Sequence, residues 1–158
     1  MKLATRLEEY LDDQNIPFET MVHPPAFCAT KLAKYLHIPG HLVAKSVLLV
    51  SPTKFILAVL PATHEVDLGA LSHCLGESVR LAREEEVAEL FLDCERGSLT
   101  PFGRLYGMNT LLDDAFRPNV AMVFEAQLHS VAIRMLCRDF ERLEQPRRCN
   151  FARPIHNN

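Results

Sequence analysis

Apolar residues recur every three or four positions in several stretches of the chain, which is the spacing of an amphipathic helix. The first such stretch runs from Leu3 to about Asp13. A second follows Thr30, whose side chain can cap it, and ends before Pro39-Gly40. Three further helices are predicted, over residues 67–76, 83–92 and 138–145.

Apolar and β-branched runs between turn residues predict strands. The clearest pair is HLVAKSVLLV and KFILAVLP, because Ser51-Pro52-Thr53 between them is a turn signal. Helices and strands alternate without a strict βαβ rhythm. The predicted fold is therefore α/β in the α+β sense, a single domain with a mixed sheet flanked by helices. Shorter strands are predicted at residues 18–23, 78–82, 109–114, 120–126 and 130–136.

Length and composition agree with one globular domain. The chain has 158 residues, of which 48% are apolar and 23% charged, and a domain typically has about 150 residues. The longest apolar runs, Val47–Val50 and Phe55–Leu60, are far shorter than the roughly 20 residues of a membrane span. The first residues turn acidic before a signal-peptide core could form. We therefore expect a cytoplasmic protein that does not contact a membrane.

The charge is small overall but uneven along the chain. A net charge of −3 is not typical of a DNA-binding protein, so no DNA partner is expected. Residues 134–158, however, contain six arginines against three acids. This excess indicates either a solvated helix face with a frayed tail or a patch that meets phosphates. We expect a domain over 1–146 and a basic C-terminal tail over 147–158.

The five cysteines are widely spaced, odd in number and without a CxxC motif. This argues against a disulfide framework and a cysteine-based zinc site, so reduced cysteines are expected. Thiol chemistry at Cys28 or Cys94 lacks a partner by spacing. His37 and His41 are the only closely spaced histidines, and Pro39-Gly40 interrupts the helix that a metal pair would need. No metal site is expected.

Three features could carry chemistry. Lys45 lies in an apolar strand, where its ammonium either reaches out to solvent or points into a polar pocket. The loop from Gly97 to Gly103 contains two glycines and Pro101, so it could approach a ligand closely or be an ordinary turn. His129, between two predicted strands, is either structural or catalytic.

The order of these features along the chain resembles the YbaK/ProX family of aminoacyl-tRNA editing domains, related to the insertion domain of bacterial prolyl-tRNA synthetases. The resemblance covers residues 3–145. It rests on His23-Pro24, VAKSV around Lys45, AVLPATHEVDL, RLAREEEVAELF, the G-x-x-x-P-F-G loop, YGMNTLLDD, FEAQLH and the closing RDFERL.

The resemblance implies a mixed sheet curled toward a barrel, with Lys45 as the central functional residue. It implies that the glycine–proline loop lines the aminoacyl pocket and that His129 lies near it. FEAG-type sequences of the family have a glycine where this chain has Gln127, a departure in the pocket wall near His129. The expected substrate-binding set is His23, Ser46, Gly97, Thr100, Pro101, Phe102, Gly103 and His129.

The activity implied is hydrolysis of the ester between a wrong amino acid and its tRNA, by a free-standing deacylase. Water attacks while Lys45 positions the substrate, without metal or cofactor. A small amino acid, alanine first, on tRNA-Pro or another tRNA is the expected substrate. The partners implied are the acceptor end of aminoacyl-tRNA and, as a further candidate, an aminoacyl-tRNA synthetase. Monomer and homodimer both stay open. The alternative is a regulatory module that binds a ligand or protein on the same fold without catalysis.

Overall fold

A computed structural model of the chain describes residues 5–155 and divides its strands among three sheets. The largest sheet contains, in spatial order, β5 (Arg80–Leu81), β2 (Ala44–Val50), β3 (Phe55–Pro61), β6 (Asn109–Asp113) and β9 (Arg147–Cys149). The strands β2 and β3 are antiparallel, whereas β6 runs parallel to β3 and β9 parallel to β6. The sheet is therefore mixed, as the sequence predicts.

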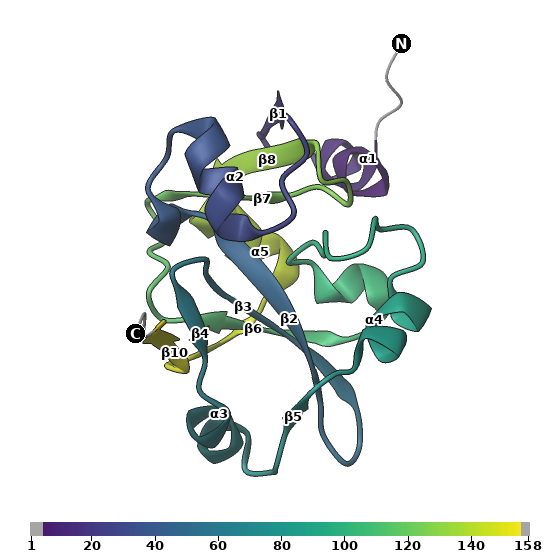
Figure 1. Cartoon of the computed structure of the whole chain (residues 1–158), viewed down its shortest axis with the longest axis vertical. Helices are drawn as coiled ribbons and strands as arrows, with labels where there is room; N and C mark the ends of the chain where they lie inside the picture. The colour runs from purple at the N-terminus through teal and green to yellow at the C-terminus, as the bar shows by residue number, and fades with distance from the viewer. Residues whose placement is uncertain (1–4, 156–158) are drawn as a thin grey trace.

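A second, antiparallel sheet lies at the other end of the molecule (Figure 1). Its strands are β1 (Glu19–Val22), β8 (Val131–Leu136) and β7 (Ala121–Glu125), with β8 in the middle. A bridge between Val43 and Val123 joins it to the start of the larger sheet. The third sheet pairs β4 (His64–Val66) with β10 (Ala152–Pro154).

Five short helices flank these sheets (Figure 1). They are α1 (Arg6–Asp13), α2 (Ala29–Leu36), α3 (Leu68–Leu75), α4 (Glu84–Leu90) and α5 (Cys137–Glu144). Two 3-10 turns, η1 (Gly40–Leu42) and η2 (Gly103–Tyr106), complete the elements. None of the helices within residues 5–155 has the length and apolar character needed to cross a membrane.

Helix starts follow local capping chemistry in α1 but not in α2. The Thr5 side chain accepts the N–H of Glu8 at 3.2 Å, and the Glu8 carboxylate accepts the N–H of Thr5 at 3.0 Å. The expectation that Thr30 caps the second helix is wrong, because that helix begins at Ala29 with Cys28 as its N-cap, two residues before Thr30. The Thr30 hydroxyl instead lies 3.3 Å from the Cys28 sulfur.

The basic C-terminal segment is part of the fold rather than a frayed tail. Residues 147–149 form the edge strand β9, and residues 152–154 pair with β4. Phe151 between them is buried, and one carboxylate oxygen of Asp113 accepts the N–H groups of Phe151 at 3.0 Å and Ala152 at 2.9 Å. An expectation based on charge alone missed this segment because its apolar anchors, Cys149 and Phe151, are few. His156 lies outside the described residues.

The expectation that all cysteines are reduced is also wrong. Cys74 at the end of α3 is bonded to Cys149 in β9, with Cα atoms 6.6 Å apart. These cysteines are 75 positions apart in sequence, so no spacing rule could pair them. They come together because α3 packs on the apolar cluster that contains Leu71, Leu111 and Phe151. Cys28, Cys94 and Cys137 are free.

Candidate active site

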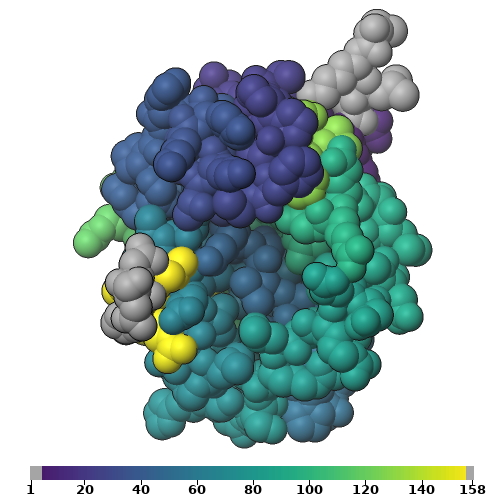
Figure 2. Space-filling view, in the orientation of Figure 1, coloured from purple at the N-terminus to yellow at the C-terminus, as the bar shows by residue number. Residues whose placement is uncertain are grey.

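A cleft of about 640 Å³ opens between β2 and α4. Figure 2 shows it as a hollow between the N-terminal segment and the segment that contains α4, with the blue of β2 at its floor. Its lining comes from residues 46–48 of β2, residues 81 and 82, α4, and the loop between residues 92 and 99. Most of this lining is apolar, which is typical of a pocket for a small molecule or a small side chain.

The polar lining of the cleft is mostly acidic. Glu84, Glu85 and Glu95 line it, and the only basic lining residue within the described chain is Arg96. Arg96 is already ion-paired with Glu84. The cleft therefore presents carboxylates to a ligand, and a group with a positive charge would be favoured there.

His129 joins the two loops that border the cleft. Its Nδ1 lies 3.0 Å from the carbonyl oxygen of Ala26, and its Nε2 lies 2.5 Å from the carbonyl oxygen of Arg96. In addition, the backbone N–H of Ala26 donates to the carbonyl of His129 at 3.0 Å. The loop before α2 and the loop after α4 are thus both held by hydrogen bonds to His129.

Both ring nitrogens of His129 lie within hydrogen-bond distance of carbonyl oxygens, an arrangement that favours the doubly protonated imidazolium over either neutral tautomer. The carboxylate of Glu125 lies 3.3 Å from Nδ1 and balances this charge. Burial opposes the charged ring, but the two carbonyl oxygens and Glu125 outweigh it and raise the pKa of His129. Burial likewise raises the pKa of Glu125 to about 7, although the imidazolium lowers it in part. An imidazolium held this way positions loops and is not free to act as a base.

Phe27 is a site residue that sequence reasoning missed. Its ring lies 5.0 Å from the His129 ring, measured between centroids, and 73% of the residue is exposed. Single exposed apolar residues are common, so the position of Phe27 against the His129 ring, and not its exposure, makes it a candidate site residue. The only signal in the sequence is the position of Phe27 directly after His23-Pro24-Pro25 and Ala26.

Lys45 is half-buried at the second position of β2, near enough to Cys28, the N-cap of α2, for the charge of that thiol to act on it. It is not a lining residue of the cleft, whereas its neighbour Ser46 is. Burial lowers the pKa of Lys45, and the charges of Glu65 and Cys28 counteract this in part. Within residues 5–155 its ammonium makes no hydrogen bond and no ion pair. It therefore has three free donors beside the loop that carries Phe27.

The glycine–proline loop contributes only its first part to the cleft. Gly97 and Leu99 line it, and Gly97 has a φ of +86°, a conformation that favours glycine. Ser98 is buried and donates to the carbonyl of Glu95 at 2.7 Å. Thr100 and Pro101 are buried as well, and the Thr100 hydroxyl has no hydrogen-bond partner among the described residues.

Phe102 and Gly103 lie in the core rather than at the cleft. Phe102 is fully buried, and its ring meets the rings of Tyr10, Phe124 and Phe140 at centroid distances of 6.1, 5.8 and 5.1 Å. A Cβ on Gly103 would lie 2.5 Å from the hydroxyl of Thr110, so close packing alone requires glycine. The structure therefore brings Gly97, Ser46 and His129 to the cleft region and places Phe102 and Gly103 behind it.

His23 lies on the same loop as Phe27, close to His129 in space. It is buried, its Nδ1 lies 2.8 Å from the carbonyl oxygen of Pro24, and its backbone N–H donates to Ser130 at 3.0 Å. Its buried Nε2 has no partner among the residues that the structure describes. The contacts observed for His23 are those of a residue that shapes the loop.

Gln127 stands where FEAG-type sequences have a glycine. Its backbone conformation explains why a glycine would suit this position. Its φ is +71°, a left-handed conformation that costs a non-glycine residue about 1–2 kcal/mol. The side chain offsets this by accepting the N–H of Leu7 at 3.0 Å and donating to the hydroxyl of Tyr106 at 3.0 Å. The departure therefore ties α1 and η2 to the strand end that carries His129.

The free cysteines near the cleft differ in reactivity. Cys94 lines the cleft, but burial raises the pKa of its thiol. The pKa of Cys28 is lowered by hydrogen bonds from the Thr30 side chain and the backbone N–H of Lys31. Within residues 5–155, no three His, Cys, Asp or Glu side chains form a group that could hold a metal ion.

Comparison with known proteins identifies relatives of this chain in sequence and in fold. The proline–tRNA ligase of Bacillus cereus (strain G9842) is 30% identical over 105 residues, which are 66% of this chain and only 18% of the ligase. Two solved structures share the fold. One is a hypothetical protein with a TM-score of 0.86 and 15% identity, covering 93% of this chain and 99% of its own. The other is a candidate trans-editing enzyme for prolyl-tRNA synthetase, with a TM-score of 0.83 and 19% identity, covering 96% and 99%.

The fold predicted from the sequence is confirmed by these structures. The model of the family described as the aminoacyl-tRNA editing domain matches residues 23–143. That match covers both loops fastened by His129 as well as β2, α4 and the cleft between them. The resemblance to the YbaK/ProX family is thereby confirmed, and the chain belongs to the family of aminoacyl-tRNA editing domains.

Proposed function

We propose that the chain is a trans-acting deacylase that hydrolyses the ester between a small amino acid and the terminal ribose of a mischarged tRNA. The observation that carries the proposal is a largely apolar cleft of about 640 Å³, in an editing domain, with the free ammonium of Lys45 beside its bordering loop. Water adds to the ester carbonyl, the bond to the ribose oxygen breaks, and that oxygen takes a proton. The products are the free amino acid and the tRNA.

The lining of the cleft fits the aminoacyl group. An aminoacyl ester carries an α-ammonium, and Glu85 and Glu95 supply carboxylates that favour it, whereas Glu84 is ion-paired with Arg96. The apolar lining from β2 and α4 suits a small side chain. A synthetase gains only about 1–3 kcal/mol from one methylene, so smaller amino acids are mischarged and need a second pocket. Alanine, cysteine, serine and threonine on tRNA-Pro are the first candidates.

Lys45 is proposed as the catalytic residue. Its ammonium can donate to the carbonyl oxygen as that oxygen becomes negative, or to the terminal phosphate, and both contacts hold the ester in place. An ester is already activated, so no nucleophilic side chain, metal or cofactor is needed. The ribose hydroxyl beside the ester can assist the attacking water.

The remainder of the acceptor end is proposed to contact α2 and the loop before it. Lys31 and Lys34 on α2 are exposed, and no acid stands in its first turn. These lysines can neutralise phosphates. The exposed ring of Phe27 offers a face on which the terminal base can stack. His129 holds that ring in place and, in this proposal, does not touch the reacting atoms.

The test is a deacylation assay with purified chain and tRNA-Pro charged in turn with alanine, cysteine, serine and threonine, with a metal chelator in half of the reactions. The expected result is rapid loss of at least one ester, unchanged by chelator. Loss that stops with chelator would contradict the metal-independent mechanism. Binding of aminoacyl-tRNA without hydrolysis of any ester would replace the proposal with the alternative, a non-catalytic binding module.

A further inference from the structure

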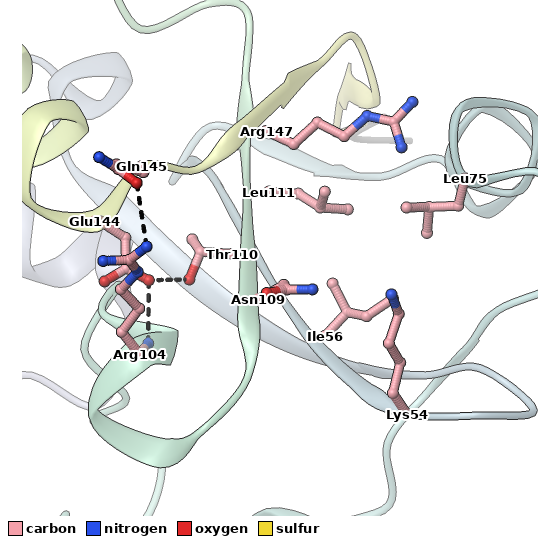
Figure 3. Close-up of a pocket in the computed structure, with 10 residues that line it drawn as sticks. All are labelled: Lys54, Ile56, Leu75, Arg104, Asn109, Thr110, Leu111, Glu144, Gln145 and Arg147. Atoms are coloured by element: carbon pink, nitrogen blue, oxygen red, sulfur yellow. Dashed lines mark hydrogen bonds between the residues drawn. The ribbon is translucent and has the colours of Figure 1, made fainter.

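A second cavity of about 290 Å³ lies at the end of the five-stranded sheet where β6 begins. Ile56, Asn109 and Leu111 line it on the face opposite the cleft, because Leu57, the residue after Ile56, pairs with Leu48 of the cleft. Thr110 pairs with Leu57 and points to the other side of β6, where Arg104 and Glu144 lie (Figure 3). We call the second one the basic cavity.

The basic cavity brings together positive charges from three distant parts of the sequence. Lys54 comes from the turn between β2 and β3, Arg104 from η2, and Arg147 from β9. In Figure 3 the Lys54 side chain rises from its turn so that the ammonium lies beside Ile56 and faces Leu75. Within residues 5–155 this ammonium makes no hydrogen bond and no ion pair.

The two arginines are oriented by uncharged oxygens. Arg104 donates to the side-chain oxygen of Gln145 at 3.2 Å, and Arg147 donates to the backbone carbonyl of Cys74 at 2.9 Å. Neither guanidinium is ion-paired with an acid of the described chain. The three charges of this cavity are therefore not neutralised by the protein, unlike Arg96 beside the cleft.

Glu144 is the single acid of the basic cavity, and it is almost fully buried. Its Oε2 accepts a hydrogen bond from the hydroxyl of Thr110 at 2.5 Å and another from the backbone N–H of Arg104 at 3.1 Å. Its Oε1 is buried without a hydrogen-bond partner among the described residues. Burial raises the pKa of Glu144 to about 7, and the Thr110 hydroxyl and Arg104 lower it only in part. An arriving anion would favour the protonated acid, whose O–H is then a donor.

We propose that the basic cavity binds a small organic anion, a compound with one phosphate or carboxylate group and a compact apolar body. Lys54 and Arg147 hold the oxyanion, and Ile56, Leu75 and Leu111 form the apolar floor on which the body rests. Charge-assisted hydrogen bonds to an oxyanion are about twice as strong as neutral ones.

Shape favours a small ligand over the backbone of a nucleic acid. The volume lies at the lower end of the range for small-molecule sites, roughly 300–1,000 Å³. A phosphodiester backbone would meet cations arranged along an open surface, whereas Lys54 and Arg147 border a concave site with an apolar floor (Figure 3). The proposal does not depend on deacylation, because the basic cavity shares no lining residue with the cleft.

The test uses calorimetric titration of the full chain with phenyl phosphate, with benzoate, and with benzyl alcohol as a neutral compound of similar body. Either anion should bind in a ratio of one to one, and benzyl alcohol should not. The tighter anion identifies whether phosphate or carboxylate is the preferred group. The side-chain amides of Asn109 and Gln145, which both line the cavity, should shift in NMR spectra on binding.

Two variants and a matched control give the decisive result. Lys54→Gln and Arg147→Gln should each weaken binding about tenfold, the effect of losing roughly one charge-assisted contact. Arg117→Gln removes the same charge from an exposed turn outside the cavity and should change binding less than about twofold.

Equal weakening by all three variants, or equal binding of benzyl alcohol, would overturn the proposal. Absence of binding by both anions, together with a raised KM for aminoacyl-tRNA in Lys54→Gln, would replace it with a contact to the RNA backbone. The melting temperature of each variant shows whether it is folded. Lys54 and Arg147 are exposed, so both variants should fold.

Discussion

The cleft and the basic cavity lie at different places on one sheet, and their charges are opposite in sign. The cleft presents three glutamates and one arginine, which is ion-paired with Glu84. The basic cavity presents Lys54 and Arg147 on one side of β6 and, on the other side, Arg104 beside Glu144, a buried acid whose pKa is raised. The more basic site is thus not the one proposed to face the tRNA ester.

In the proposed function, the overall charge of the ligand does not decide which site it enters. A mischarged tRNA is a polyanion, but the group proposed to enter the cleft is a cationic amino acid with a small apolar side chain. In this proposal the phosphates stay outside, where Lys45 and α2 offer positive charge. Because the two sites share no lining residue, changes in one should leave the other intact.

The largest expected effect is that of Lys45→Ala on the cleft alone. Removing a donor that stabilises a developing oxyanion typically costs a factor of about 10²–10³ in kcat. We expect a loss of that size in kcat/KM for deacylation, measured by release of the amino acid. Binding of phenyl phosphate or benzoate at the basic cavity should stay unchanged. Arg117→Gln, which also removes one positive charge, is the control and should retain full activity.

Phe27→Ala should have the next largest effect, and it should be confined to substrate binding. Stacking of a base on an aromatic ring is worth about 1–3 kcal/mol. We therefore expect KM for aminoacyl-tRNA to rise by roughly tenfold with little change in kcat. Phe27→Tyr keeps the ring and should restore KM. A change in kcat alone would show that Phe27 orders the loop and does not contact the tRNA.

His129→Gln tests whether the imidazolium fastens the two loops. The folded-state pKa of His129 is raised, so its stabilisation is present at acid pH and is lost as the pH rises through that value. The variant should be less stable than the wild type by about 1–3 kcal/mol at pH near 6. The gap in free energy of unfolding should narrow toward about pH 9. A gap independent of pH would exclude a charged ring.

The smallest effect is expected from Glu144→Gln in the basic cavity. Burial raises the pKa of Glu144 to about 7, so the folded state binds its proton more tightly than the unfolded state. Ionisation of Glu144 therefore destabilises the wild type as the pH rises from the ordinary pKa of a glutamate to the folded-state pKa of about 7. Relative to the wild type, the variant should gain stability over that interval, by about 1 kcal/mol. Denaturant unfolding at pH near 5 and near 8 measures it, and an unchanged difference would contradict the prediction.

Local pattern predicted most of the elements, because each depends on neighbouring residues. The β2–β3 hairpin and the five helices follow from periodicity and turn residues. Residues 147–154 could not be predicted as strands, since their pairing with β6 and β4 depends on the acceptor Asp113, far away in sequence. The same is true of the bond between Cys74 and Cys149.

Sequence reasoning could select a candidate site residue only where its residue type was unusual for its surroundings. Lys45 in an apolar strand and Gly97 in a tight loop are of this kind. Phe102 was misleading, because an aromatic residue in a motif gives no sign of whether it faces a ligand or the three rings it packs against. The role of His129 depends on carbonyl oxygens of Ala26 and Arg96, which no side-chain pattern reveals.

The position of β9 at the edge of the large sheet also constrains the order of folding. During synthesis, β2, β3 and β6 leave the ribosome well before residues 147–149, so the outer edge of β6 stays unpaired until α5 has been made. An unpaired strand edge is a template for aggregation. The bond that joins α3 to β9 can also form only after that point. A pause in translation just before residue 147 would therefore prolong the time during which the edge of β6 is unpaired and open to aggregation.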